Sequence, residues 1–370
     1  MIFLDILAAI AIIQGLITLI GGLRAARHMR TFRPRTERHD RVIVFCPCKG
    51  IDPEFETNIR SILDQDYANF GVRFVVESKD DPAYGILRRL GIHDVLVAGY
   101  AADRGQKVHN LAYAVQHAGE LAGIYVFCDS DARFDRQWLS KLIAPLGAMN
   151  VTTGYRWYVV NRFHWPTLLR SAWNASVVSL LGNHAGNFAW GGSMAMTRST
   201  FEQLHILDAW RGSVSDDYAV TRAAEAAGAR IIFVPECLIP SYGESGWREL
   251  FEFTTRQIII TRVYHPRLWR IGFVAQVIFA AAFIALPFTQ PALWLTIYGL
   301  SSARAWVRLR AVGSVFPVMS LPRFGWFYIL FSPLIPLLYL YNMVRSALST
   351  DIVWREKHYK LVSPNQTGVY

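Results

Sequence analysis

Short apolar runs alternate with segments of helical periodicity between residues 41 and 128. The apolar runs are Arg41–Lys49, Val72–Glu77, Val95–Ala98 and Tyr125–Cys128. The segments Glu56–Asp64 and Gly105–Glu120, which lie between these runs, carry helical patterns. Strands that alternate with helices over about 100 residues are typical of a parallel α/β sheet, so the pattern predicts such a sheet here.

A longer apolar segment, Ile6–Leu23, precedes this region. Its length is close to the roughly 20 residues that span a bilayer. A signal peptide is the alternative, but signal peptides carry positive charge before the apolar run. Here Asp5 precedes the run, and a group of arginines follows it: Arg24, Arg27, Arg30, Arg33, Arg35 and Arg38. This asymmetry predicts a retained anchor whose C-terminal side faces the cytoplasm.

Further apolar segments follow residue 270. Ile271–Phe288 predicts one span, Pro291–Ala303 the start of a second, and Phe324–Met343 a third that Pro333 and Pro336 interrupt. Three spans place the C-terminus outside, whereas a re-entrant or interfacial segment at the prolines returns it to the cytoplasm; the sequence leaves both open. We expect an anchor at residues 1–25, a cytosolic α/β domain at 40–265, membrane or interfacial helices at 270–345 and a cytosolic tail at 346–370.

The composition supports a membrane setting. Hydrophobic residues make up 52% of the 370 residues, charged residues 18%, and the net charge is +10. Basic chains bind nucleic acid, anionic lipid or phosphate, but the arginines beside apolar segments act as orientation signals, so we expect no nucleic-acid partner. The four cysteines form no CxxC pair and have no histidine at zinc spacing, so we expect neither a zinc site nor a disulfide framework.

Two aspartates directly follow the run Tyr125–Cys128. Asp129 and Asp131 are two residues apart, and a strand places such residues on one face. Neighbouring carboxylates repel unless a positive group lies between them, and Mg²⁺ or Mn²⁺ accepts carboxylate and phosphate oxygens. A metal at the carboxyl end of a strand is therefore one interpretation, because open α/β sheets bind ligands there. A polar Asp-Ser-Asp turn is the other.

Two later segments each allow two interpretations. Ser215 is a plausible N-cap of a helix over Ser215–Ala227, and the acidic Asp216 and Asp217 in its first turn are either functional or ordinary helix electrostatics. Tyr155–Trp190 mixes aromatic residues with arginines, as do surfaces at the lipid headgroup level and the edges of aromatic cores. No G-x-G-x-x-G or Walker sequence follows the first strand, so a bound nucleotide would depend on strand-end carboxylates and a metal.

The order of short motifs resembles the membrane-bound family 2 glycosyltransferases, and more closely the ceramide glucosyltransferases of family 21 and their bacterial relatives. The matching pieces, in order, are KGIDP at Lys49–Pro53, DDPA at Asp80–Ala83, QKVHNL at Gln106–Leu111, CDSDAR at Cys128–Arg133, GGSM at Gly191–Met194, SDDY at Ser215–Tyr218 and WREKHYKL at Trp354–Leu361. The resemblance implies an α/β GT-A catalytic domain, Rossmann-like with a mostly parallel sheet, plus α-helical transmembrane segments.

The resemblance also implies roles for individual residues. Asp217 is the expected general base, because it directly precedes Tyr218, and Asp216 is its competitor. Asp129 and Asp131 are expected to hold Mn²⁺ or Mg²⁺. The expected donor-binding residues are Lys49, Glu77, Asp80, Asp81, Lys107, Asp129, Arg256 and Arg262. The expected acceptor-side residues are Gly192, Ser193, Asp216 and Trp354.

One departure from the family pattern affects the acceptor. The family carries Arg or Gln, two variable residues and Arg-Trp after the base, whereas this chain reads Arg256-Gln257-Ile258-Ile259-Ile260. Either Arg256 and Arg262 contact the diphosphate from a shifted register, or the acceptor pocket differs.

The resemblance implies an inverting enzyme that transfers a sugar, glucose from UDP-glucose as first choice, to a membrane lipid, ceramide as first choice. The implied location is the cytoplasmic face of a bacterial inner membrane, in a multi-pass protein. The alternatives are another lipid acceptor (a hopanoid or diacylglycerol), a processive polysaccharide synthase and an inactive relative.

Overall fold

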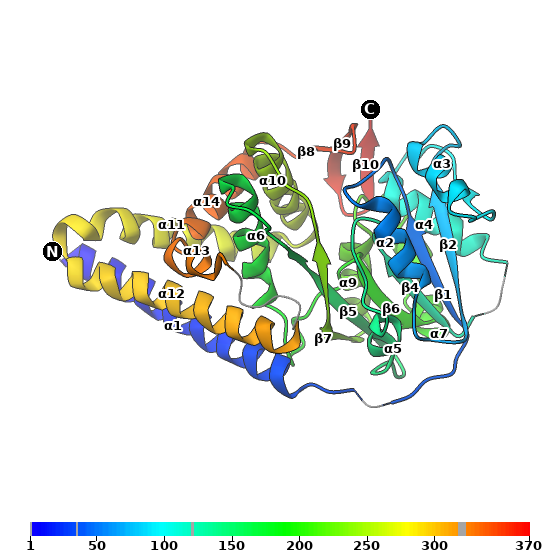
Figure 1. The fold of residues 1–370 in the computed structure, drawn as a ribbon. Coiled ribbons are helices and arrows are strands. Elements are labelled where there is room, and N and C mark those ends of the chain that lie inside the picture. Colours follow the sequence, from blue (N-terminus) through cyan, green and yellow to red (C-terminus); the bar gives the residue numbers. More distant parts are fainter. Residues whose placement is uncertain (1, 35, 120–121, 317–322) are drawn as a thin grey trace. The chain divides into compact units, whose positions relative to one another are not determined.

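The computed structural model describes residues 2–34, 36–119, 122–316 and 323–370 (Figure 1). Within these residues the chain forms two compact units. The sheet unit comprises Phe32–Val159, His184–Gly243 and Asp351–Tyr370, and the helical unit comprises Met1–Thr31, Val160–Asn183 and Glu244–Thr350. Arg35 of the predicted basic group and Glu120 at the end of a predicted helix lie outside the described residues.

A mostly parallel sheet is the centre of the sheet unit, as predicted. In the described residues it has seven strands in the order β3-β2-β1-β4-β6-β5-β7. Strands β1 to β4 pair in parallel, as do β5 and β7, whereas β6 runs antiparallel to both β4 and β5. The bounds are β1 Val42–Pro47, β2 Phe70–Val76, β3 Leu96–Val97, β4 Ile124–Cys128, β5 Asn150–Tyr158, β6 Ser193–Thr197 and β7 Arg230–Ser241.

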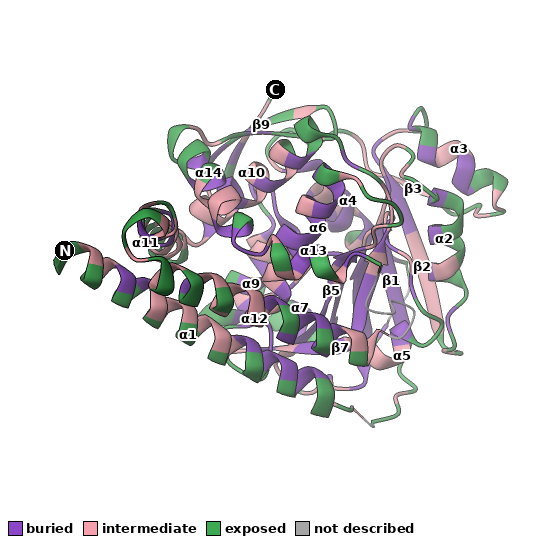
Figure 2. Ribbon diagram, turned by 60° about the vertical axis from the view of Figure 1, so that its left-hand side comes forward, coloured by how far each residue is buried: buried purple, intermediate pink, exposed green. Residues whose placement is uncertain are grey.

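Alternating side chains of each strand enter cores on opposite faces of this sheet. In β1, Val42 and Val44 belong to one buried cluster, whereas Ile43 and Phe45 belong to another. This is the period of two that a strand covered on both faces requires, and Figure 2 shows β1 as mostly buried. The helices of the first cluster are α2 Phe55–Leu63, α3 Pro82–Arg89 and α5 Trp138–Ile143, and those of the second are α4 Gln106–Gln116, α7 Arg198–Gln203, α8 Ile206–Ala209 and α9 Asp216–Ala226.

The C-terminal tail adds a small antiparallel sheet to the same unit. Its strands are β8 Asp351–Trp354, β9 Lys357–Ser363 and β10 Gln366–Val369. Ile352, Tyr359 and Leu361 of this sheet are buried. The tail is therefore part of the folded sheet unit.

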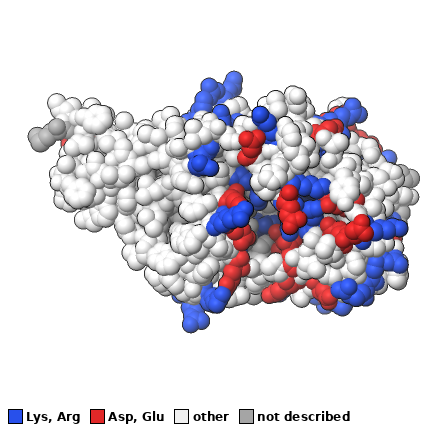
Figure 3. All heavy atoms as spheres, turned by 90° about the horizontal axis from the view of Figure 1, so that it is seen from above, with Lys and Arg blue, Asp and Glu red and all other residues white. Residues whose placement is uncertain are grey.

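Two long apolar helices stand out in the helical unit. Among the described residues, α1 Ile2–Thr31 and α11 Pro266–Thr289 are long and apolar enough to cross a membrane, by length and composition. They contain the predicted spans Ile6–Leu23 and Ile271–Phe288. Gln14 of α1 donates to the Ala275 carbonyl of α11 over 3.1 Å. In the view of Figure 3, the surface around the N-terminal end of α1 and the C-terminal end of α11 carries few charged side chains.

The predicted third C-terminal run is not one continuous helix. Phe324–Met343 forms α13 Gly325–Leu330 and part of α14 Leu334–Leu348, with Pro333 between them. Proline lacks the N–H that a helix interior needs, which accounts for the break at Pro333. The predicted interruption at Pro336 is wrong, because Pro336 lies in the first turn of α14, where no N–H is needed. The predicted start at Pro291 is the first residue of α12 Pro291–Val315. The remaining helices of this unit are α6 Trp165–Val178 and α10 Trp247–Tyr264.

The aromatic segment Tyr155–Trp190 is divided between the two units. Trp157 and Trp173 are buried in the cores of their respective units, whereas Phe163 and Trp165 of the helical unit are 46% and 39% exposed. Burial supports the core interpretation for the first pair. Of these two pairs, only the exposed Phe163 and Trp165 are consistent with a surface at the lipid headgroup level.

The compact units group the chain differently from the predicted domain limits. Residues 160–183 and 244–265 of the predicted 40–265 domain lie in the helical unit, and residues 351–370 of the predicted 346–370 tail lie in the sheet unit. The limits at 1–25 and 270–345 fall within the helical unit. The predicted boundaries as functional domains stay predictions.

Candidate active site

Charged side chains gather at the carboxyl ends of β1, β2 and β4. Lys49 follows β1, Glu77 follows β2 and Asp129 follows β4. Since these strands are parallel neighbours, their carboxyl ends share one edge of the sheet. Ligands of open α/β sheets bind at this edge. The sheet topology therefore places these three residues where a site is expected.

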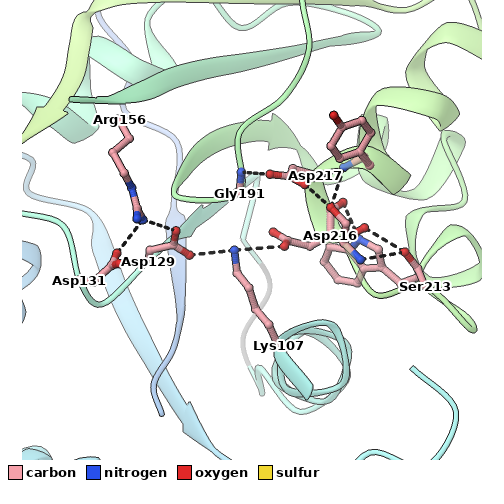
Figure 4. A network of polar contacts seen from close by, with 11 residues as sticks. Lys107, Asp129, Asp131, Arg156, Gly191, Ser213, Asp216 and Asp217 are labelled. Carbon is pink, nitrogen blue, oxygen red and sulfur yellow. Dashed lines mark hydrogen bonds and ion pairs between the residues drawn. The ribbon is translucent and has the colours of Figure 1, made fainter. Parts of the chain in front are cut away.

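Lys107 joins two of the predicted aspartates. It lies in the first turn of α4, and its Nζ is 2.8 Å from Asp129 Oδ1 and 3.1 Å from Asp216 Oδ1 (Figure 4). Burial alone would lower the pKa of Lys107, but the charges of Asp129 and Asp216 outweigh it and raise the pKa. Lys107 therefore stays charged and connects the end of β4 with the start of α9.

Arg156 of β5 lies between Asp129 and Asp131. One of its terminal nitrogens is 3.0 Å from Asp129 Oδ2 and 2.7 Å from Asp131 Oδ1 (Figure 4). Burial opposes ionisation of Asp129, but Lys107 and then Arg156 outweigh it and lower the pKa of that carboxyl. The two carboxylates converge on one guanidinium nitrogen, and carboxylates that converge in this way are suited to bind a divalent cation.

The donor set fits a cation that also takes ligands from a substrate. In the described residues no three His, Cys, Asp or Glu side chains form a group that could hold a metal by themselves. Mg²⁺-type sites, however, use one or two carboxylates together with substrate phosphates and water. Asp129 and Asp131 fit that arrangement.

Asp217 and Asp216 open α9 in different environments. The Ser215 side chain caps the helix by accepting from the Tyr218 N–H, as predicted. Asp217 is half-buried and accepts from the backbone N–H groups of Gly191, at 3.1 Å, and Tyr218, at 2.8 Å, and from the Ser215 hydroxyl. Asp216 is 1% exposed, and its Oδ2 has no hydrogen-bond partner among the described residues. Only Asp217 of the two is accessible to a substrate.

The burial of Asp216 has a consequence for stability. Burial raises the pKa of Asp216 most, Lys107 opposes it, and the nearby Asp217 and Asp129 add to it, which gives a pKa of about 7. An unfolded aspartate has a pKa of about 3.9. Between these values the folded protein binds a proton that the unfolded chain has released, so wild-type stability falls as pH rises through this window.

We expect the stability difference between the wild type and Asp216→Asn to depend on pH. The wild type should lose stability relative to Asp216→Asn from about pH 4 to pH 7, because only the aspartate titrates, and the difference should be constant above pH 7. Denaturant unfolding at pH steps from 4.5 to 8 measures this difference. A stability difference that is constant over the whole pH range would contradict the burial of Asp216 and its raised pKa.

Gly191 lies close to the Lys107–Asp216 ion pair. A Cβ atom at this position would overlap Asp216 Oδ2 and lie 2.7 Å from Lys107 Nζ. We therefore expect Gly191→Ala to displace the Lys107–Asp216 pair and destabilise the fold by about 1–3 kcal/mol, the usual cost of overpacking. Differential scanning fluorimetry measures the loss. Gly228→Ala is not a suitable control, because Gly228 has positive φ. Gly246→Ala, where a Cβ meets open space, should change little.

Glu77 is clamped by two lysines at the end of β2. It forms ion pairs with Lys49 and with Lys357, whose Nζ is 2.8 Å from Glu77 Oε2. Burial opposes ionisation, but Lys357 and Lys49 outweigh it and lower the pKa of Glu77. Asp81 caps α3 and accepts from the Ala83 and Gly50 N–H groups, each at 2.9 Å. Asp80 is exposed and accepts from the Ser78 hydroxyl at 3.2 Å.

The other predicted residues are more scattered. Ser193 is fully buried and its hydroxyl accepts from Trp138 Nε1 at 2.8 Å, and Gly192 packs against the Trp190 ring. Trp354 ends β8. Arg256 and Arg262 belong to α10 in the helical unit, where Arg262 donates to the Ser346 carbonyl.

The family can be identified from the whole chain. The family model described as Glycosyl transferase family 21 matches residues 3–367. The chain belongs to glycosyl transferase family 21. This confirms the resemblance that the short motifs indicated.

Known proteins similar to this family 21 member agree with its fold. A ceramide glucosyltransferase of Komagataella phaffii is 45% identical over 49 residues, which cover 13% of this chain and 10% of that enzyme. The mannosyltransferase PcManGT of Pyrobaculum calidifontis, solved in complex with GDP-Man and Mn²⁺, has a TM-score of 0.50 at 18% identity over 93% of this chain and 98% of its own. The GT-A fold is therefore confirmed, and family and fold support a sugar-nucleotide-dependent transferase.

Four members of this site were not predicted from the sequence. Arg156 appeared there only as one of several arginines in an aromatic segment, and Asp52, Arg355 and Lys357 only as letters within longer motifs. In the structure Arg355 is 2.6 Å from Asp52 Oδ1. For Arg355 and Lys357 the tail motif was the available signal, since it groups basic residues that can pair with the predicted acidic ones.

Proposed function

We propose that this family 21 protein is an inverting glycosyltransferase that moves glucose from UDP-glucose to the hydroxyl of a membrane lipid, with ceramide as the first candidate. The observation that carries the proposal is one connected network at the carboxyl edge of the sheet. In it Lys107 joins Asp129 to Asp216, and Asp217 lies accessible beside them. The network supplies a donor-binding part and a proton acceptor side by side.

The donor diphosphate is proposed to bind beside Asp129 and Asp131. Within the described residues, three cations face four carboxylates: Lys107, Arg156 and Arg355 against Asp52, Asp129, Asp131 and Asp216. A diphosphate adds more negative charge to this excess. A divalent cation held by Asp129 and Asp131 would neutralise the charge that develops on the leaving nucleotide. Mn²⁺ in the Pyrobaculum mannosyltransferase complex supports this choice of cofactor.

Asp217 is the proposed general base. The acceptor oxygen forms a bond to the anomeric carbon, the bond from that carbon to the diphosphate oxygen breaks, and the hydroxyl proton passes to Asp217. Hydrogen bonds from Gly191 and Tyr218 fix the carboxylate. A single displacement with one base inverts the anomeric centre.

The remaining donor-side residues follow from the resemblance. Glu77, Asp80 and Asp81 are proposed on the uridine side, with Lys49 held against Glu77. Arg256 and Arg262 stay proposed donor contacts. Gly192, Ser193, Asp216 and Trp354 stay proposed on the acceptor side. For Ser193 and Asp216, burial favours a supporting role behind the acceptor rather than direct contact with it.

A lipid acceptor is supported by the two apolar helices and by the relative from Komagataella. Among the residues that the structure describes, α1 and α11 have the length and composition of membrane spans, and the matching segment of the relative belongs to a ceramide glucosyltransferase. We propose an integral, multi-pass protein of a bacterial inner membrane with its active site on the cytoplasmic face. The arginines after α1 favour that orientation.

A panel of acceptors tests the proposal. Purified protein in detergent with Mn²⁺ or Mg²⁺ is given UDP-glucose, with UDP-galactose and UDP-GlcNAc as competitors, and ceramide, diacylglycerol or a hopanoid. We expect lipid-dependent UDP release with ceramide and UDP-glucose. Turnover with another lipid alone would refute ceramide and keep the mechanism. Long sugar polymers as product would instead indicate a polysaccharide synthase.

A further inference from the structure

The C-terminal sheet of β8, β9 and β10 contacts the rest of the sheet unit at several points. The Gln106 N–H at the start of α4 donates to the Tyr359 hydroxyl at 3.2 Å, and the Thr367 hydroxyl donates to the Gly212 carbonyl at 2.7 Å. Gly212 is so close to the turn between β9 and β10 that a Cβ there would overlap the Asn365 carbonyl. The C-terminal sheet is thus fixed against both α4 and the segment that leads to α9.

Strands β8 and β9 form a hairpin, and its turn has an unfavourable backbone for its sequence. Trp354 pairs with Lys357, so the loop consists of Arg355 and Glu356. Their φ angles are 50° and 68°, as in the two-residue turns for which Asn-Gly is preferred. Residues other than Gly, Asn and Asp pay for positive φ, and such strain gathers at functional sites. Arg355 and Glu356 are therefore better explained by a functional role than by the stability of the turn.

The turn directs two cations at the carboxyl edge. Arg355 contacts Asp52 at 2.6 Å, and its next strongest electrostatic partners are Asp131 and Asp129. Lys357 is 2.8 Å from Glu77 and 2.7 Å from Gln106 Oε1. The hairpin therefore contributes charge to the β4 end and to the β2 end of the site.

Arg355 differs from Arg156 in its accessibility. The Arg355 side chain is 40% exposed, whereas that of Arg156 is 12% exposed and divided between two carboxylates. Asp52 is buried by comparison and its Oδ2 has no hydrogen-bond partner within the described residues. Asp52 thus holds Arg355 through one oxygen, and the guanidinium keeps N–H donors on its open side. A guanidinium with free donors binds phosphate oxygens in a fork.

We propose that Arg355 binds the diphosphate of the nucleotide-sugar donor, with Asp52 as its positioning residue. The inference rests on the proposed function and adds to it a donor contact from the C-terminal tail. Uridine lacks the diphosphate and makes no contact with Arg355. Loss of Arg355 therefore weakens UDP binding without weakening uridine binding.

Calorimetric titration of the full-length protein in detergent with UDP and with uridine, in the presence of Mn²⁺, tests this. The variant is Arg355→Asn, because asparagine tolerates positive φ and the turn keeps its shape. We expect UDP affinity to fall about 10- to 100-fold, as for a lost charge-assisted hydrogen bond, with uridine affinity and melting temperature maintained. Arg355→Lys, which keeps the charge and loses the fork, should lie between.

Two controls separate binding from turn stability. Arg136→Asn removes an exposed arginine of the same unit that pairs with Asp64 and should leave UDP affinity unchanged. Glu356→Gly removes the strain of a positive φ angle from the same turn, so it should raise the melting temperature and keep UDP affinity.

The outcomes distinguish the inference from the proposed function. Equal losses of UDP and uridine affinity in Arg355→Asn, or unchanged UDP affinity, would overturn the role of Arg355 while wild-type UDP binding keeps the proposed function. A wild type that does not bind UDP would overturn both.

Discussion

Replacing Asp217 with asparagine is expected to reduce turnover by about 10²- to 10⁴-fold, the usual contribution of a general base. Asparagine keeps the size of the side chain, and its single carbonyl oxygen can replace one of the two carboxylate oxygens that accept separately from the Gly191 and Tyr218 N–H groups. It cannot take the acceptor proton. The affinity for UDP should therefore stay close to that of the wild type, because Asp217 is not among the proposed donor ligands.

Two other aspartates serve as comparisons for this variant. Asp208→Asn changes an exposed residue that pairs with Arg211 at 3.0 Å and should keep full turnover. Asp216→Asn should lower UDP affinity as well as turnover, because it removes a partner of Lys107. If Asp216→Asn lost turnover with full UDP affinity while Asp217→Asn stayed active, the base would be Asp216.

Replacing Lys107 with methionine is expected to cost about 3–5 kcal/mol of stability, the usual effect of removing one partner from a buried ion pair. Asp129 and Asp216 would both lose the cation 2.8 Å and 3.1 Å from them, and this cation lowers the pKa of each. Both carboxyls of the folded variant would therefore have a higher pKa than in the wild type. The loss should therefore grow as pH rises from 5 to 8.

Denaturant unfolding across that pH range measures the effect, with Lys141→Met as the control. Lys141 pairs with the exposed Asp135 at 3.3 Å, so its loss should cost less than about 1 kcal/mol. A Lys107→Met protein as stable as the control at pH 8 would show that Lys107 does not balance these carboxylates.

Local patterns were sufficient to predict strands β1 to β4 and part of the site. The apolar run before Asp129 predicted β4, but Asp129 and Asp131 follow that strand in a turn, where both contact Arg156. Ser215 ahead of an Ala-rich segment predicted the N-cap of α9. These signals lie within a few residues of each other, where backbone geometry alone decides which side chains meet.

Contacts between distant segments could not be predicted in the same way. The positive group between Asp129 and Asp131 is Arg156 in this structure, 27 residues beyond the first aspartate, whereas the sequence suggested a metal there. Arg355 and Asp52 are 303 residues apart, and only the docking of the tail hairpin brings them together. The antiparallel direction of β6 beside β4 likewise depends on how the chain returns, which periodicity does not specify.

The proposed role of Arg355 changes the interpretation of the altered Arg256–Ile260 motif. Its Ile258, Ile259 and Ile260 are buried in the helical unit. If Arg355 supplies a diphosphate contact, the donor does not depend on an intact Arg-Trp pair in α10. The altered motif then bears on the acceptor rather than on whether the protein is active, which disfavours the inactive-relative alternative.

The most direct test of the account is the product formed from UDP-glucose and ceramide by purified wild-type protein with Mn²⁺. Mass spectrometry of the lipid fraction, together with UDP release, should show glucosylceramide and UDP in equal amounts, with the β-anomeric configuration that inversion of the α-linked donor requires. UDP-glucose binding without any glycosylated lipid from ceramide, diacylglycerol or a hopanoid would contradict lipid glycosylation at this site.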